Sequence, residues 1–334
     1  MKRSILLAVI FASLFIEAKA FTALNGSGAT FPAPLYLRWA SDFGKANNTV
    51  SINYQGVGSG AGVKQFGDGI TDFGASDVAM TDAEIAKMGG NVLMLPVTGG
   101  TIVLAYNIPG VQAGLKLSRL NYTSIFLGKI QHWNDPLIVK DNPGLKIPNL
   151  PITVVTRSDG SGTTAVFTAH LDAVSPEFAA NVGSGKSVTW PVGLAGKGND
   201  GVTALIKQTP GAIGYVEFGY ANNNKLTMAD LQNRAGNFIF PSIESGAATL
   251  ASVVLPENLR AFIPDPDGAD DYPIATFTWL LVKKTYPDTE KATVIKDFVN
   301  YGLTKGQDAA PLLGYISLPP SVVAKVQATL DTVK

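Results

Sequence analysis

Three short segments of the chain each place a serine or threonine hydroxyl, with glycine or proline beside it, immediately before a predicted helix. The segments are residues 26–32, 56–62 and 157–164. The first turn of a helix leaves backbone N–H groups without partners, and the helix dipole puts partial positive charge at the same end. Such a turn holds an oxyanion without a full cation, and hydroxyls add adjustable donors. The spacing therefore predicts anion-binding turns.

The first two segments contribute three predicted ligand residues. In residues 26–32, Thr30 and Phe31 precede prolines that suit the start of a helix, and we expect both to face the ligand. The alternative is that Thr30 only caps that helix. In residues 56–62, Ser59 is the single side-chain donor. This run also matches a loose dinucleotide pattern, Gly-x-Gly-x-x-Ala, so a nicotinamide-dependent enzyme and a ligand-free glycine turn are the alternatives.

The third segment carries the strongest signal. Arg157 suits bidentate contact with an oxyanion, and Asp159, two residues later, can hold the guanidinium in place. An exposed arginine–aspartate turn is the alternative. The donors expected at the start of the following helix are Ser161, Gly162 and Thr163.

One carboxylate, Asp77, ends a strand-like stretch over residues 72–77 and is expected in the same lobe as Ser59. An ionised aspartate accepts a hydrogen bond from an anion that keeps a proton at neutral pH, but it repels one that is fully deprotonated. Asp77 therefore predicts a preference for phosphate over sulfate. The alternative is an ordinary loop or helix-capping residue.

Strand-like and helix-like stretches alternate along the chain, which is typical of an α/β fold built from βαβ units. Alternating or continuous apolar residues predict strands at 50–54, 101–106, 152–155 and 276–282. These strands must end where the glycine-rich turns begin if the turns are to reach one ligand.

A chain of 334 residues is long enough for two lobes, each with its own core. We expect crossings between the lobes at Gly99-Gly100 and at Tyr272-Pro273. One lobe then consists of residues 21–97 with 273–334, and the other of residues 98–272. The cleft between them is the expected ligand site.

The N-terminus predicts a secretory signal peptide over residues 1–20, with a basic start, an apolar run at 5–16 and the cleavage pattern Ala18-Lys19-Ala20. The chain has no cysteine, which excludes disulfides, thiolate metal sites and a lipid-bearing cysteine. Its 26 basic and 26 acidic residues give no basic field, so nucleic acid is not an expected partner.

Four motifs together resemble the periplasmic phosphate-binding proteins of ABC-type phosphate transporters. They are residues 28–34, 54–59, 72–77 and 157–163. The likeness covers nearly the whole chain after the signal peptide, through residues 127–135, 196–201, 210–217 and 317–319. One departure is Gly60-Ala61-Gly62, where some relatives have Ser-Gly-Gly.

The resemblance implies a two-lobed α/β fold in which phosphate is buried between the lobes and held by hydrogen bonds. Thr30 and Phe31 would bind through backbone N–H groups, Ser59 through its hydroxyl and N–H, and Asp77 would accept the ligand's proton. The second lobe would complete the shell with Arg157, paired to Asp159, and with Ser161, Gly162 and Thr163. The implied location is the periplasm, and the implied partner is the membrane permease of an ABC-type importer. No cofactor or metal is implied, and we expect a monomer.

The alternatives are a secreted phosphatase and a binder of another oxyanion, such as sulfate, molybdate or a phosphate ester. The two histidines, His132 and His170, have no metal-ligand spacing around them and are expected at the surface or in packing. Ser161 does not lie in the Gly-x-Ser-x-Gly pattern of serine hydrolases. Residues 222–268 carry no recognisable motif.

Overall fold

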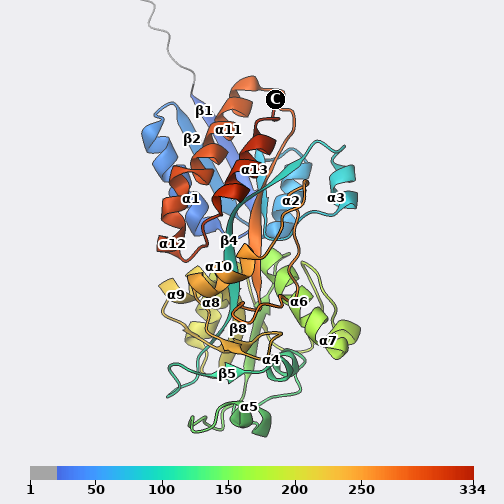
Figure 1. Ribbon diagram of the computed structural model, residues 1–334, viewed down its shortest axis with the longest axis vertical. Helices are drawn as coiled ribbons and strands as arrows, with labels where there is room; N and C mark the ends of the chain where they lie inside the picture. The colour runs from blue at the N-terminus through green and yellow to red at the C-terminus, as the bar shows by residue number, and fades with distance from the viewer. Residues whose placement is uncertain (1–20) are drawn as a thin grey trace, which may run out of the picture.

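The computed structural model describes residues 21–334, in which two α/β lobes share one long mixed sheet (Figure 1). The strand order is β2-β1-β3-β12-β4-β8-β6-β7, and β9 also pairs with β4. The strands are β1 (Thr22–Gly28), β2 (Val50–Gly56), β3 (Phe73–Ser76), β4 (Leu93–Tyr106), β6 (Thr153–Arg157), β7 (Leu194–Gly196), β8 (Ala212–Glu217), β9 (Thr227–Met228) and β12 (Ala275–Val282). A second, small sheet consists of β5 (Lys116–Leu117), β10 (Asp230–Gln232) and β11 (Phe238–Ile239).

Helices cover the sheet in two groups, one at each end of the molecule in Figure 1. Around β1, β2 and β3 lie α1 (Ala33–Ala46), α2 (Ser59–Gly67), α3 (Asp82–Lys87), α11 (Thr289–Leu303), α12 (Ala310–Leu313) and α13 (Pro320–Leu330). At the other end lie α4 (Arg119–Phe126), α5 (Pro136–Asp141), α6 (Gly162–Val174), α7 (Pro176–Asn181), α8 (Gly198–Gln208) and α9 (Phe218–Asn223). Helix α10 (Ile243–Ala251) lies between the groups, against β4 and β12. No helix among residues 21–334 is both long and apolar enough to cross a membrane.

The α/β class and the predicted strands are confirmed, each within a residue or two at its start, except that β4 begins eight residues before the predicted 101–106. Residues 93–101 of β4 pair with β12, and residues 102–106 pair with β8, so this one strand joins the two halves of the sheet. Gly99 and Gly100 lie inside it. A β-carbon on Gly100 would lie 2.7 Å from the ring of Phe31, so the glycine lets that ring pack against the strand. The lobe boundaries near 97 and 272 stay a prediction.

A segment without regular secondary structure, residues 259–265, runs from one helix group to the other, and we call it the strap. At its start, the indole N–H of Trp279 donates to the carbonyl of Leu259 at 2.8 Å. The guanidinium of Arg260 pairs with Asp82 of α3 at 2.6 Å. These contacts hold one end of the strap to the lobe that contains β3.

The other end of the strap is held by the opposite lobe. Arg119 of α4 forms a bidentate ion pair with Asp265, at 3.0 and 2.8 Å. The buried ring of His170 bonds through Nδ1 to the carbonyl of Pro264 at 2.8 Å, and through Nε2 to the hydroxyl of Tyr122 at 2.9 Å. His170 is therefore a packing residue, as predicted, and the strap gives residues 222–268 one identifiable structural role.

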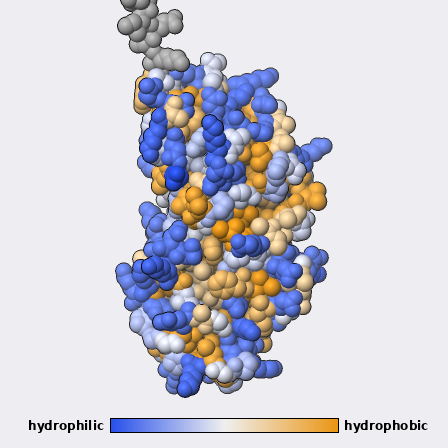
Figure 2. Space-filling view, turned by 60° about the vertical axis from the view of Figure 1, so that its left-hand side comes forward, coloured by the Kyte–Doolittle hydropathy of each residue, from blue (hydrophilic) through white to orange (hydrophobic). Residues whose placement is uncertain are grey.

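The surface shows the same division into two ends. Figure 2 shows hydrophilic residues over most of both ends of the molecule, with hydrophobic residues gathered at the waist between them. His132 lies at the surface, as predicted.

Candidate functional site

The start of α2 faces the start of α6 across the junction of the lobes. The N–H of Gly60 donates to the carbonyl of Gly160 at 2.8 Å. A β-carbon on Gly162 would lie 2.5 Å from Oγ of Ser59 and 2.8 Å from Oδ2 of Asp77. The predicted site residues of the two lobes are thus brought into van der Waals contact.

The N-terminal turns differ in how they are capped. At α6, the hydroxyl of Ser161 accepts from the N–H of Thr164 at 3.0 Å, so Ser161 is the N-cap. The interpretation of Thr30 as a helix cap is wrong, because α1 begins at Ala33 after Pro32 and no side chain caps it. The hydroxyl of Thr30 instead faces α8, where it accepts from the backbone N–H of Asn199 at 3.1 Å and from its Nδ2 at 2.9 Å.

Five buried backbone N–H groups at the junction have no acceptor among residues 21–334. They belong to Thr30, Phe31, Ser59, Gly162 and Thr163. The carbonyls of Thr30 and Phe31, in contrast, are occupied by the hydroxyls of Tyr220 and Tyr315, each at 2.7 Å. Buried backbone donors are nearly always paired, so this cluster of unpaired N–H groups indicates a binding site for a ligand with hydrogen-bond acceptors.

Asp77 provides the carboxylate at this junction and is only 1% exposed. Its Oδ1 accepts from the hydroxyl of Thr278 at 2.8 Å, and its Oδ2 lies 3.4 Å from Oγ of Ser59. Burial raises the pKa of Asp77 to about 7, although the bond from Thr278, the charge of Arg157 and the bond from Ser59 each lower it. The group can therefore accept or donate a proton near neutral pH.

Arg157 is held by Asp159 in a buried bidentate pair, with Nε–Oδ1 at 2.8 Å and Nη2–Oδ2 at 2.6 Å. Burial alone would raise the pKa of Asp159. The hydrogen bonds from Arg157, the positive charge of Arg157 and the bond from the N–H of Gly198 together hold that pKa below its usual range. The remaining guanidinium nitrogen, Nη1, lies 3.3 Å from the hydroxyl oxygen of Thr163. Asp159 therefore neutralises and orients Arg157, as predicted from their spacing.

Two residues that were not among the predicted site residues lie in the network. Asn199, the second residue of α8, bonds to the hydroxyls of both Thr30 and Thr163. Thr278 binds Asp77 from β12, a strand 201 residues later in the chain. Asn199 lies in a motif that carries the family resemblance, so that motif was a signal. Thr278 gave none, because only the pairing of β12 with β3 brings it to Asp77.

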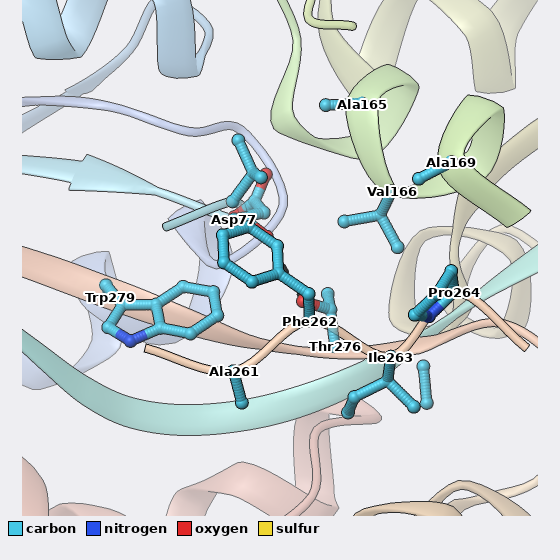
Figure 3. Close-up of a pocket in the computed structure, with 12 residues that line it drawn as sticks. Asp77, Ala165, Val166, Ala169, Ala261, Phe262, Ile263, Pro264, Thr276 and Trp279 are labelled. Atoms are coloured by element: carbon cyan, nitrogen blue, oxygen red, sulfur yellow. Dashed lines mark hydrogen bonds between the residues drawn. The ribbon is translucent and has the colours of Figure 1, made fainter. Parts of the chain in front are cut away.

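A cavity of about 150 Å³ lies on the other side of Asp77, between α6, β12 and the strap. In Figure 3 the side chains of Val166, Phe262 and Trp279 point toward the same space. The walls are mainly apolar, with Asp77 and Thr276 as the polar exceptions. This cavity is therefore not the anion site, although Asp77 borders both.

Among residues 21–334, no group of three histidine, cysteine, aspartate or glutamate side chains is placed to hold a metal ion. The candidate site thus consists of backbone N–H groups, hydroxyls, one carboxylate and one guanidinium whose charge is balanced by Asp159. Such a set matches a small tetrahedral oxyanion better than a cation or an apolar ligand.

Comparison with known proteins agrees with this chemistry. Residues 16–305 match the model of the PBP superfamily domain. A protein named phosphate-binding protein PstS from Pasteurella multocida is 40% identical over 334 residues, which is 99% of this chain and 96% of the relative. A PstS protein from Methanocaldococcus jannaschii is 41% identical, over 92% of this chain and 85% of the relative.

Solved structures share the fold at lower identity. A high affinity periplasmic phosphate-binding protein, PfluDING, bound with phosphate, aligns with a TM-score of 0.74 at 24% identity, over 92% of this chain and 93% of that one. A phosphate-binding protein from Stenotrophomonas maltophilia aligns with a TM-score of 0.73 at 20% identity, with the same coverage. The family resemblance is thereby confirmed: the chain belongs to the PBP superfamily and, within it, to the family of the phosphate-binding proteins PstS.

Proposed function

We propose that the protein binds inorganic phosphate between its two lobes, in the periplasm, and delivers it to the membrane permease of an ABC-type importer. The observation that carries the proposal is the cluster of five buried, unpaired N–H groups around one carboxylate. The names of the relatives, phosphate-binding protein PstS, support the choice of phosphate. The predicted signal peptide lies outside the described residues.

The proposed ligand contacts follow from the free donors. The N–H groups of Thr30, Phe31, Ser59, Gly162 and Thr163 would donate to phosphate oxygens. The hydroxyls of Thr30, Ser59, Ser161 and Thr163 would add four more donors, and Arg157 a charged one. Because Asp159 balances the charge of Arg157, the anion would be held mainly by neutral N–H and O–H dipoles. Such donors select an anion by the positions of its oxygen atoms and not only by its charge.

Asp77 is the proposed proton acceptor and the source of selectivity. Its carboxylate and the phosphate share one proton, whichever of them carried it before binding. Sulfate carries no proton at neutral pH and meets an ionised Asp77 as a like charge in a buried place, at a cost of a few kcal/mol. We therefore propose a binding protein rather than a phosphatase, since the described site consists of hydrogen-bond donors around one carboxylate and neither histidine lies in it.

The proposal is tested by calorimetric titration of the protein, freed of bound anion, with phosphate and then with sulfate at pH 8. We expect phosphate to bind with a dissociation constant of about 1 μM or tighter, because five heavy atoms at the best ligand efficiencies give ~7.5 kcal/mol and charged hydrogen bonds add to it. Sulfate should bind far more weakly than phosphate at this pH. Absence of phosphate binding would overturn the proposal, and equal binding of both anions would remove the role of Asp77.

Sulfate binding should depend on pH in a way that phosphate binding does not. The raised pKa means that unliganded Asp77 is mostly ionised above pH 7 and mostly protonated below it. A protonated carboxyl donates to sulfate, so the sulfate affinity should rise about tenfold from pH 8 to pH 6 and then level off. The Asp77→Asn variant, whose amide always donates, should bind sulfate with little pH dependence. A sulfate affinity in the wild type that is the same at pH 8 and pH 5 contradicts this assignment.

A further inference from the structure

Asn199 is completely buried at the start of α8 and touches groups from both lobes. Its backbone N–H and its Nδ2 both donate to Oγ1 of Thr30, at 3.1 and 2.9 Å. The same Nδ2 lies 3.4 Å from Oγ1 of Thr163. The amide has two hydrogens on Nδ2, so it can serve both hydroxyls at once.

The orientation of this amide is set by its other end. Oδ1 of Asn199 accepts from the backbone N–H of Glu217 at 3.0 Å. A flipped amide would place two donors against each other at that contact and leave the threonine oxygens facing an acceptor. Nδ2 therefore points to the threonines, and Glu217 is held in place in turn because its carboxylate accepts from the N–H groups of Gly219 and Tyr220 in α9.

The consequence concerns the direction of the two hydroxyl hydrogens. A hydroxyl oxygen accepts about two hydrogen bonds and donates one. Oγ1 of Thr30 already receives two, both from Asn199. Oγ1 of Thr163 also receives two, from Asn199 and from Nη1 of Arg157, at 3.4 and 3.3 Å. Each hydroxyl therefore has only its hydrogen left for a ligand.

We infer that Asn199 is a specificity-determining residue, which makes Thr30 and Thr163 donors only, so that neither hydroxyl competes with Asp77 for a ligand proton. The inference rests on the proposed function and refines it. If the hydroxyls were free to rotate, they could accept the protons of a more protonated anion. With Asn199 present, the favoured ligand is an oxyanion that offers acceptor oxygens to Thr30 and Thr163 and keeps its proton for Asp77.

The test replaces Asn199 with aspartate, which keeps the shape and the acceptor toward Glu217 but removes Nδ2. The hydroxyls of Thr30 and Thr163 can then donate to the new carboxylate and present lone pairs to the ligand. Titration with phosphate at pH 8 should show an affinity about 100-fold weaker than that of the wild type. The affinity should recover toward pH 5, with one more proton taken up per phosphate bound, measured by calorimetry in two buffers of different ionisation enthalpy.

Asn181→Asp is the matched control, since Asn181 is an exposed α7 residue whose amide bonds only to the carbonyl of Glu177. It should bind phosphate as the wild type does. A loss in Asn199→Asp that is equal at all pH values, without extra proton uptake, would mean that Asn199 only supports the packing and would overturn the inference. Wild-type affinity in Asn199→Asp would overturn it as well.

A second pair of variants decides the question if Asn199→Asp does not fold. Asn199→Ala should weaken phosphate binding about tenfold in the wild-type background, but less in a Thr30→Val background, because only the hydroxyl of Thr163 is then left for Asn199 to orient. Equal losses in both backgrounds would overturn the inference. A wild-type protein that binds no phosphate would instead refute the proposed function, whatever the variants do.

Discussion

Replacement of Gly162 by alanine should weaken phosphate binding by about 100-fold while leaving the fold intact. The added β-carbon would lie 2.5 Å from Oγ of Ser59 and 2.8 Å from Cβ and Oδ2 of Asp77, all of which belong to the facing lobe. Packed groups cannot absorb so close a contact, so the start of α6 has to withdraw from α2. Two free N–H groups, those of Gly162 and Thr163, would move away from the other donors.

The Gly162→Ala variant distinguishes an effect on the closing of the two lobes from an effect on folding. Residue 162 stands in the first turn of α6 without a positive φ angle, so alanine suits its backbone and the melting temperature without phosphate should stay close to that of the wild type. Small-angle scattering in saturating phosphate should give a larger radius of gyration for the variant. Gly44→Ala is the control, because its β-carbon would meet only the carbonyl oxygen of Val50, at 3.6 Å. Wild-type affinity and compactness in Gly162→Ala would contradict the proposed site.

Replacement of Arg157 by alanine should weaken phosphate binding by at least about 1000-fold, the largest effect that we expect. The change removes the one cation among the predicted ligand residues and leaves Asp159 without its bidentate partner, close to where the anion would bind. Loss of one partner of a buried ion pair costs ~3–5 kcal/mol, and the unpaired carboxylate also repels the ligand. Calorimetric titration at pH 8 measures the affinity, and thermal unfolding measures the stability.

The two contributions can be separated by removing both charges. Arg157→Ala with Asp159→Ala should regain part of the lost melting temperature, because no buried charge is then unpaired, and part of the affinity, because the repulsion is gone. It should still bind phosphate far more weakly than the wild type does. The control is Arg38→Ala, since Arg38 is exposed and pairs with Asp42 on the surface of α1. Full affinity in the double variant would show that Arg157 does not reach the phosphate.

The parts of the site that could be predicted from the sequence depend on residues close together in the chain. At Ser59 and at Ser161, a glycine, a hydroxyl and a helix start lie within a few residues of each other. The free N–H groups of these helix starts therefore follow from the local sequence alone. The ion pair of Arg157 with Asp159 spans only two residues, and it formed as expected. The α/β class followed in the same way from the alternation of strand-like and helix-like stretches.

The parts that the sequence did not predict depend on pairings between distant segments. Asn199 reaches Thr30 across 169 residues, and no local pattern marks its amide as the partner of a hydroxyl in the other lobe. Thr30 is a similar case, because its hydroxyl fits the pattern of a helix cap but accepts from Asn199 instead. The strap could not be predicted at all, since a segment without regular secondary structure makes its contacts to α3, α4, α6 and β12, which are far apart in the chain.

The late position of β12 in the chain has a consequence for how the protein is made. Strand β12 supplies Thr278 to Asp77 and lies between β3 and β4 in the sheet, yet it follows them by about 170 to 200 residues. A chain that emerges from its N-terminus must therefore wait, with the edges of β3 and β4 unpaired, until the last sixth of the sequence arrives. Folding of the first lobe and assembly of its carboxylate are thus late events, and a chain shortened before residue 275 would be left with open strand edges that invite aggregation.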